Sequence, residues 1–583
     1  SKLSNRDYMG EFVSGPCAPL ILAPGIGGSV LQVEIECEKL LLTDYDTFIS
    51  CGWIDCKQGS KVAPKKEYRI WVSETDSPMS ILSPIDLNKK CWAGLIGQKY
   101  DTVKGQVVPV KKTGVTIKPM GTTPLTYPRS VSACGINAVK DIIPGIINPE
   151  YSAYYSDLVK TLHTMGYKDG LTMVGLPYDY RAGEGDDSFA PMLLYSLQQL
   201  NKLSGKKTVV VAHSMSNNRM LNALWKMSQS DKDTLIHNYL ALAPSWLGSV
   251  CPVLFLTCGQ SGFYFKDNLG IDFKRWKDSI GAYLSTFELS PSRIYKFDRF
   301  LPWMEQILKR IKYDQGESSS TGDIDFIPTR DQICYPNYDK KNCRSGLSIL
   351  DDYGSFNGST ITNDNYRQFI DEHGYLQNMS SIWNLWEEKF ETTLPNPGVQ
   401  INIVYTSVVD TDSGYVFGQD PRSFTDKDEF CPSSSYIVLN TTGDDTVPST
   451  SSVTPGFKWA LEYKNNQTDA KPIKFIELCS SQNPQPSPYD GKDSQGIYRV
   501  NKNGYIGVPC DCTQGKVRHC DHNTMLFLPN LLSFVSQTAM TNQLTPLPAF
   551  IQNMSDNQLN QYVDTCQALL QSTPTLDILT ATE

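Results

Sequence analysis

The sequence lacks several features that would place it in common functional classes. No stretch approaches the roughly 18 consecutive apolar residues that a membrane-spanning helix needs, so we expect a soluble or peripheral protein. The net charge of −9 provides no basic surface of the kind that binds nucleic acid. Neither a P-loop nor a G-x-G-x-x-G motif is present, and we expect no cofactor.

Cysteine, by contrast, is plentiful. The chain has 16 cysteines, which favours up to eight disulfides in an oxidising compartment. It begins at Ser1 without methionine or an apolar leader, which fits a mature form whose signal peptide has been removed. We therefore expect a secreted protein or one of the lysosomal lumen. Five glycosylation sequons agree with this, at Asn357, Asn378, Asn440, Asn466 and Asn553.

A zinc site is the alternative use of the tightest cysteine cluster. Cys510 and Cys512 are followed by His519, Cys520 and His522, which are ligand types for zinc. The cluster lacks the C-x-x-C spacing of structural zinc sites, so we expect no metal.

Short apolar runs alternate with helical patterns along much of the chain. We predict strands over residues 19–23, 171–176, 240–244, 401–405 and 475–478, and one running from residue 209. Helical patterns cover residues 154–165, 189–203 and 219–227. This alternation predicts an α/β protein with a mostly parallel sheet that is covered on both faces.

The strand from residue 209 stops abruptly at Ser214. A nucleophile on a strained strand-to-helix turn needs small neighbours two residues before and two after it. Those neighbours are Ala212 and Ser216, where the usual G-x-S-x-G pattern has glycine. Ser214 is thus a candidate nucleophile, and an ordinary serine after a core strand is the alternative.

A serine nucleophile needs a base and an acid that orients the base. On an α/β-hydrolase sheet the chain order is serine, acid, histidine, which leaves only histidines well beyond Ser214. His522 lies just before an apolar helical run, where a loop could present it at the edge of the sheet, and His519 is the second choice. Asp444 follows a predicted strand and a glycine, whereas the adjacent Asp445 is an alternative that could instead stabilise the turn. Asp179 precedes the serine, and we expect it in a buried ion pair with a residue such as Arg181. Only six histidines are available: His163, His213, His237, His373, His519 and His522.

Two further stretches fit such a site. Residues 24–29 (PGIGGS) form a glycine-rich turn after the first strand, where a backbone N–H could point into an oxyanion hole. Residues 51–112 carry eleven basic and six acidic residues, together with closely spaced cysteines and apolar residues. Tryptophan with lysine is typical of contact with a lipid surface, whereas a solvated face or a small packed cluster is the alternative. The candidate contacts are Trp53, Ile54, Trp71 and Trp92.

Six motifs together resemble the lecithin:cholesterol acyltransferase and lysosomal phospholipase A family of α/β-hydrolases. They occur in the family's order and bracket residues 19–535. The glycine turn, residues 177–181 (PYDYR), the His213–Met215 stretch and residues 242–249 (LAPSWLGS) are four of them. Residues 443–447 (GDDTV) and 522–525 (HNTM) are the other two.

The resemblance implies the roles of individual residues. Ser214 would attack an acyl ester, Asp444 would orient His522, and the N–H groups of Ile26 and Met215 would stabilise the oxyanion. It also implies a lid and membrane-binding region at residues 48–106. The implied activity is a phospholipase A or lipid acyltransferase at a membrane or lipoprotein-like surface, with water, a sterol or another alcohol as acceptor. A catalytically weak lipid-binding or structural protein is the alternative.

We expect the following division of the chain. The α/β-hydrolase core comprises residues 1–47, 107–250 and 398–540. Residues 48–106 form a disulfide-tied excursion, 251–397 an inserted cap, and 541–583 a C-terminal extension without a counterpart in the family.

Overall fold

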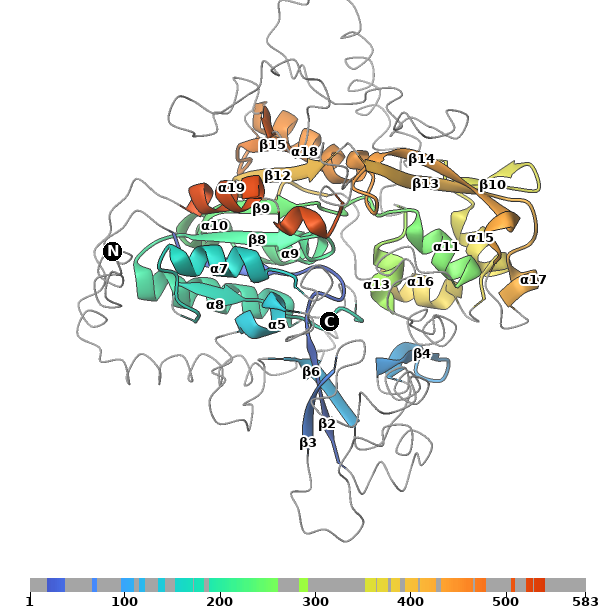
Figure 1. The fold of residues 1–583 in the computed structure, drawn as a ribbon, viewed down its shortest axis with the longest axis horizontal. Coiled ribbons are helices and arrows are strands. Elements are labelled where there is room, and N and C mark those ends of the chain that lie inside the picture. Colours follow the sequence, from blue (N-terminus) through green and yellow to red (C-terminus); the bar gives the residue numbers. More distant parts are fainter. Residues whose placement is uncertain are drawn as a thin grey trace, which may run out of the picture.

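A computed structural model provides the fold of the chain (Figure 1). The residues that it describes are 18–36, 66–70, 96–109, 115–120, 135–141, 153–170, 172–182, 188–259, 283–291, 352–362, 364–375, 379–387, 394–406, 409–425, 431–464, 467–478, 505–508, 521–527 and 529–539.

A seven-stranded sheet forms the centre of the molecule, and all of its strand pairs are parallel. In spatial order the strands are β16 (Tyr505–Val508), β15 (Ile473–Leu478), β12 (Ile401–Thr406), β9 (Ile236–Leu242), β8 (Thr208–His213), β1 (Leu20–Ala23) and β7 (Met173–Gly175). Every residue of β1, β8 and β12 is buried. Strands buried on both faces have near-continuous apolar sequences, and the predicted parallel sheet is confirmed.

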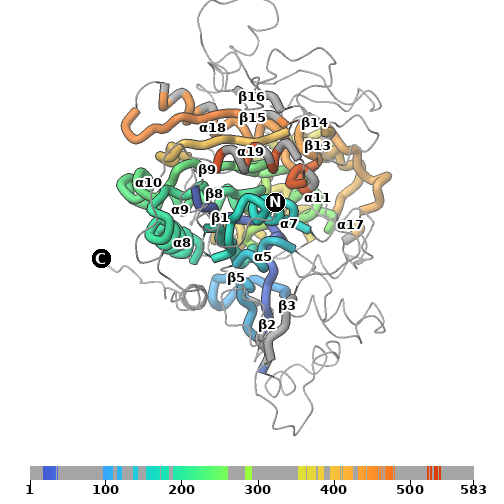
Figure 2. The backbone as a smooth tube through the Cα atoms, turned by 60° about the vertical axis from the view of Figure 1, so that its left-hand side comes forward, coloured from blue at the N-terminus to red at the C-terminus, as the bar shows by residue number. Residues whose placement is uncertain are grey.

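Helices cover both faces of this sheet (Figure 2). Ile21 and Val210 join one apolar cluster, and their neighbours Leu20 and Val209 join the other, because successive side chains of a strand point to opposite faces. The first face packs against α8 (Phe189–Ser204), α9 (Ser216–Lys226), α10 (Gln229–Leu235) and α18 (Ser449–Lys464). The second packs against α5 (Ile136–Lys140), α7 (Ser156–Thr164) and α19 (Pro529–Ala539).

A second sheet lies beside the first, at the right in Figure 1. Its order is β11 (Ser359–Thr360), β10 (Gly354–Phe356), β13 (Val409–Phe417) and β14 (Tyr436–Gly443). The helical elements of this region are α11 (Cys251–Cys258), α13 (Leu284–Glu288), α15 (Tyr366–His373), α16 (Met379–Glu387), α17 (Arg422–Thr425) and the 3₁₀ turn η6 (Ser433–Ser435). The strands after residue 398 therefore divide between two sheets, because β12 joins the central sheet and β13 joins β10.

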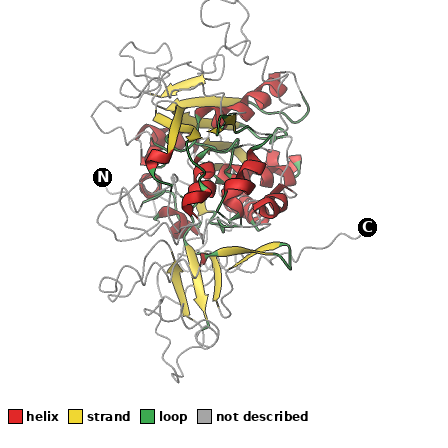
Figure 3. Ribbon diagram, turned by 90° about the vertical axis from the view of Figure 1, so that its right-hand side faces the viewer, coloured by secondary structure: helices red, strands yellow, loops and turns green. Residues whose placement is uncertain are grey.

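Small antiparallel pieces follow the first strand (Figure 3, bottom). A three-stranded sheet has the order β3 (Lys66–Ile70), β2 (Leu31–Ile35) and β6 (Val115–Pro119), and a hairpin pairs β4 (Gln98–Asp101) with β5 (Gln106–Pro109). The four predicted lipid contacts, Trp53, Ile54, Trp71 and Trp92, lie outside the described residues, as does the extension 541–583.

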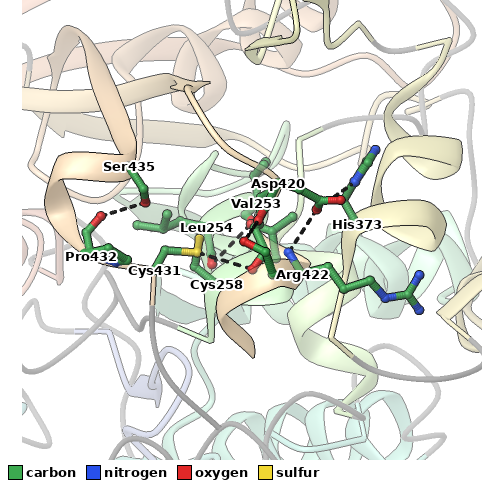
Figure 4. The surroundings of a disulfide bond; sticks show 12 residues. Val253, Leu254, Cys258, His373, Asp420, Arg422, Cys431, Pro432 and Ser435 are labelled. Atoms are coloured by element: carbon green, nitrogen blue, oxygen red, sulfur yellow. Dashed lines mark hydrogen bonds and ion pairs between the residues drawn. A yellow bond between two sulfur atoms is a disulfide. The ribbon is translucent and has the colours of Figure 1, made fainter. Parts of the chain in front are cut away.

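One disulfide joins described residues, between Cys258 at the end of α11 and Cys431 before η6 (Figure 4). Cys251 is also buried, and its Sγ lies 3.9 Å from the carbonyl oxygen of Thr446. Within the described ranges no helix is long and apolar enough to cross a membrane. No cluster of three potential metal ligands occurs there either, and Cys510, Cys512, His519 and Cys520 lie outside these ranges.

Candidate active site

Ser214 stands at a sharp turn between the end of β8 and the start of α9. Its φ angle is 57°, in the left-handed region that residues other than glycine rarely adopt. The turn is held from the neighbouring strand, because the Ser214 N–H donates to the carbonyl of Leu242 at 2.9 Å. The predicted strained elbow is therefore present without glycine on either side.

The two residues that replace the elbow glycines are both buried. Ala212 is fully buried and pairs with Ala23 of β1. The Ser216 hydroxyl accepts the N–H of His213 at 2.9 Å, and it lies 2.9 Å from the carbonyl oxygen of Ala23 and 2.8 Å from that of His213. Either carbonyl can take its single proton. Donation to Ala23 ties the elbow to β1, which glycine could not do.

The structure brings Ser214, His522 and Asp444 together from distant parts of the chain. Nε2 of His522 lies 2.7 Å from Oγ of Ser214, and Nδ1 lies 2.7 Å from Oδ2 of Asp444. All three side chains are almost completely buried. A neutral histidine with its proton on Nδ1 donates to the carboxylate and accepts the serine proton at Nε2, which is the arrangement of a serine nucleophile with its base.

Asp444 is fixed by the turn that follows β14. Its Oδ1 accepts the backbone N–H groups of Thr446 at 3.0 Å and Val447 at 2.6 Å, which leaves Oδ2 for the histidine. The main chain of His522 is attached to the same turn, because its N–H donates to the Asp444 carbonyl at 2.7 Å. Asp445 has a φ of 76° and donates its N–H to Thr411 Oγ1, so its backbone shapes this turn.

The glycine-rich turn after β1 lies directly against the elbow. A Cβ built on Gly25 would stand 2.6 Å from Cβ of Ser214, closer than real Cβ contacts come. Ile26 follows in this turn, and Met215 is the N-cap residue of α9, at the positively polarised end of that helix. Of the two residues expected to donate to an oxyanion, Met215 therefore follows Ser214 directly, and Ile26 follows the glycine that lies against Ser214.

A further histidine and a tyrosine lie behind the site. His213 is fully buried, and its Nδ1 lies 2.5 Å from the hydroxyl of Tyr154. Its Nε2 lies 2.9 Å from the carbonyl oxygen of His522, and the hydroxyl of Tyr154 accepts the N–H of Gly25 at 2.7 Å. Burial, and secondly the nearby His522, lower the pKa of His213 well below the ordinary value. The sequence motifs assigned no role to either residue, although His213 is adjacent to the nucleophile.

The expected ion pair of Asp179 is confirmed. Arg181 reaches both oxygens of this carboxylate, at 2.8 Å through Nε and 2.6 Å through a terminal nitrogen. Burial alone would raise the pKa of Asp179, but the charge and hydrogen bonds of Arg181 bring it below the ordinary value. This pair also anchors the hairpin region, because Arg181 donates to the carbonyl of Ile96.

Two of the five sequons fall within the described residues. Asn357 is exposed in the turn between β10 and β11, where a glycan has room. Asn440 is 3% exposed within β14, so the folded chain leaves no room for a glycan there. Asn378, Asn466 and Asn553 lie outside the described residues.

The family model for lecithin:cholesterol acyltransferase matches residues 129–484, more than half of the chain. The chain belongs to the lecithin:cholesterol acyltransferase family. The resemblance carried by the six motifs is thereby confirmed. The matched range includes Ser214 and Asp444, whereas the glycine turn and His522 lie outside it.

Relatives within this family match parts of the chain. "Lysosomal phospholipase A and acyltransferase" of Bos taurus is 34% identical over 110 residues, 19% of this chain and 27% of that protein. The Homo sapiens protein of the same name is 29% identical over 250 residues, 42% of this chain and 52% of its own. "Phosphatidylcholine-sterol acyltransferase" of Homo sapiens is 24% identical over 250 residues, 43% and 48% of the two chains. The matches therefore span about a quarter to a half of these relatives.

Proposed function

We propose that this family member is a serine-dependent lipid acyl-ester hydrolase or acyltransferase that cleaves a fatty acyl ester of a glycerophospholipid. The observation that carries the proposal is the pair of 2.7 Å contacts that join Ser214 to His522 and His522 to Asp444. The names of the relatives, phospholipase A and sterol acyltransferase, support a lipid ester as substrate.

The reaction would proceed in two steps. Oγ of Ser214 attacks the acyl carbonyl carbon while its proton passes to Nε2 of His522. The bond to the glycerol oxygen breaks, His522 returns the proton to that oxygen, and the acyl group stays as an ester on Ser214. A water molecule or a lipid alcohol then attacks this ester and gives its proton to His522, which restores Ser214. The N–H groups of Ile26 and Met215 would hold the negative oxygen at each step, and one such donor contributes about 3 kcal/mol.

The alternative of a catalytically weak lipid-binding protein rested on the missing elbow glycines. The φ of 57° at Ser214 favours the enzyme, because strain of this kind is retained at sites where it positions a reactive group. We therefore expect activity in spite of Ala212 and Ser216.

Labelling with a fluorophosphonate tests the nucleophile. We expect covalent modification of the native protein at Ser214 and none in Ser214→Ala, with loss of hydrolysis by about a millionfold. Ser204→Ala, at the far end of α8, is the matched control and should label normally. Equal labelling of the native protein and Ser214→Ala would exclude the assignment.

Defined phospholipid vesicles distinguish the two outcomes of the reaction. Incubation without an alcohol should give free fatty acid and lysophospholipid, detected by mass. Addition of a sterol or another lipid alcohol gives a new ester if the chain transfers the acyl group. Vesicles that give neither free fatty acid nor a new ester under these conditions would contradict the substrate class.

We also propose that the protein works outside the reducing cytosol, in a secreted or lysosomal setting. The Cys258–Cys431 disulfide supports this, as does the word lysosomal in the name of two relatives. Contact with a lipid surface through Trp53, Ile54, Trp71 and Trp92 remains part of the proposal. Co-sedimentation with anionic vesicles should weaken when these four residues are replaced by alanine, and unchanged sedimentation would contradict it.

A further inference from the structure

His213 connects three separate segments of the active site. It follows the last apolar residue of β8 and precedes Ser214, and its ring is buried. One of its nitrogens faces Tyr154, which lies two residues before α7. The other faces His522, more than 300 residues further along the chain. Tyr154 in turn contacts Gly25 of the turn after β1. The chain of contacts therefore runs from the predicted oxyanion turn to the loop of the base.

The direction of every hydrogen bond in this chain follows from its two ends. The carbonyl of His522 can only accept, so Nε2 of His213 carries the proton and donates at 2.9 Å. A neutral imidazole has one N–H, so Nδ1 accepts from the hydroxyl of Tyr154. The backbone N–H of Gly25 can only donate, and it does so to the same hydroxyl oxygen. Each donor thus has one acceptor.

Neutrality of His213 agrees with its surroundings. Its ring centre lies 4.7 Å from that of His522, and burial lowers the pKa of His213 well below the ordinary value. A positive charge at His213 would oppose the charge that His522 takes up when it accepts the serine proton. A neutral donor holds His522 without this repulsion.

The backbone of His522 is held from both sides as a result. Its N–H donates to the carbonyl of Asp444, and its carbonyl accepts from His213. Asp444 also holds the ring through Nδ1. With the ring and both backbone groups attached, Nε2 is aimed at Ser214.

We propose that His213 is a positioning residue for the reaction, which fixes the loop of His522 against the elbow and couples that loop through Tyr154 to the Gly25 turn. The inference rests on the proposed function, because it assigns a role within the same site. It adds two residues, His213 and Tyr154, to the machinery expected from the sequence.

Two substitutions separate positioning from simple packing. Glutamine places an N–H near the position of Nε2, so His213→Gln keeps a donor for the His522 carbonyl. Asparagine reaches only the position of Nδ1, so His213→Asn loses that donor. We expect kcat for phospholipid hydrolysis to fall by about a hundredfold in His213→Asn, the loss that misplacement of a catalytic group by about 1 Å causes, with KM nearly unchanged. His213→Gln should regain most of this loss, and His237→Asn on β9 is the matched control.

If His213→Asn does not fold, Tyr154→Phe and nitrogen NMR of the native chain still test the inference. Nitrogen NMR of the histidine-labelled native chain should show His213 as the neutral Nε2–H form at pH values around 6.5, where an ordinary histidine titrates. Tyr154→Phe removes the donor to Nδ1, so the signal should change and kcat should fall.

The outcomes that overturn the inference differ from those that overturn the proposed function. Equal kcat in the native chain, His213→Asn and His213→Gln would overturn it. An equal loss of kcat in both variants, accompanied by an equal decrease in their melting temperatures, would also overturn it. A charged or Nδ1–H form of His213 in the native spectrum would also overturn it. If the native chain is not labelled at Ser214, the proposed function fails and this inference fails with it.

Discussion

At the scale of single residues, a departure from the usual elbow pattern acquires a physical role. Glycine normally stands two residues after the nucleophile because side chains crowd the turn. Here the small hydroxyl of Ser216 fits and bonds to groups on both β8 and β1. The strained φ of Ser214 is therefore maintained by a hydrogen-bonded tie.

Removal of that hydroxyl should destabilise the fold. In Ser216→Ala the buried N–H of His213 loses its acceptor, and we expect the free energy of unfolding to fall by about 1–3 kcal/mol. Urea denaturation measures this change. Thr161→Ala, which removes a hydroxyl bonded to a helix carbonyl in partly exposed α7, is the control and should cost less. Equal decreases in the free energy of unfolding of the two variants would show that the Ser216 hydrogen bonds stabilise the fold no more than an ordinary helix hydroxyl does.

The buried His213 should make stability depend on pH. Its pKa is lowered by burial and secondly by His522, so the unfolded chain binds a proton below pH of about 6.5 that the folded chain refuses. Stability then decreases as the pH falls below that value, by at most about 1.4 kcal/mol per pH unit from this group. The native chain should lose more stability between pH 6.5 and pH 5 than His213→Gln does. Parallel curves for the two proteins would contradict the prediction.

At the scale of elements, the turn after β1 and the elbow after β8 are packed too closely for a side chain at Gly25. An added methyl group would meet Cβ of Ser214 at 2.6 Å and the hydroxyl of Tyr154 at 2.8 Å. We expect Gly25→Ala to displace the turn and to slow fluorophosphonate labelling by about a hundredfold. Gly418→Ala is the matched control, because its nearest contact is an ordinary 3.5 Å. Normal labelling of Gly25→Ala would show that the turn plays no part in the reaction.

Elements with a continuous apolar pattern could be predicted from the sequence, and their pairing partners could not. The strands β1, β8 and β12 were predicted because both of their faces are buried. Asp444 was also placed after a strand, as the structure has it. Nothing in the residues of β14 indicated that this strand pairs with β13 in a second sheet, because register depends on partners far along the chain.

The same distinction applies to the site. Serine, acid and histidine were predicted because each lies in a short motif, and the three motifs occur in the order that an α/β-hydrolase requires. The contacts of His213 with Tyr154 and His522 span 59 and 309 positions, and they exist only once the sheet has formed. Their polar partners are buried, so no periodicity in the sequence indicated them.

At the scale of the whole molecule, the site depends on two sheets at once. The central sheet provides Ser214 at the end of β8, and the second sheet provides Asp444 at the end of β14. The loop of His522 bonds to both, through His213 on one side and Asp444 on the other. Relative movement of the sheets would therefore separate the base from its acid or from the nucleophile.

The Cys258–Cys431 disulfide should stabilise the second sheet region without taking part in the site. It closes a loop of 173 residues between α11 and the segment before β14. Cys258→Ala together with Cys431→Ala should lower the free energy of unfolding by about 2–5 kcal/mol, because the unfolded chain regains the freedom of that loop. Urea denaturation of the native chain and of the double variant measures this change.

Labelling should separate this effect from catalysis. Asp444 is held by Thr446, Val447 and His522 rather than by the disulfide, so the double variant should react with fluorophosphonate at the native rate below its melting temperature. Cys251→Ala, at another buried cysteine, is the control and leaves the 173-residue loop closed. Slow labelling of the folded double variant would mean that the disulfide also sets the position of the second sheet against Ser214.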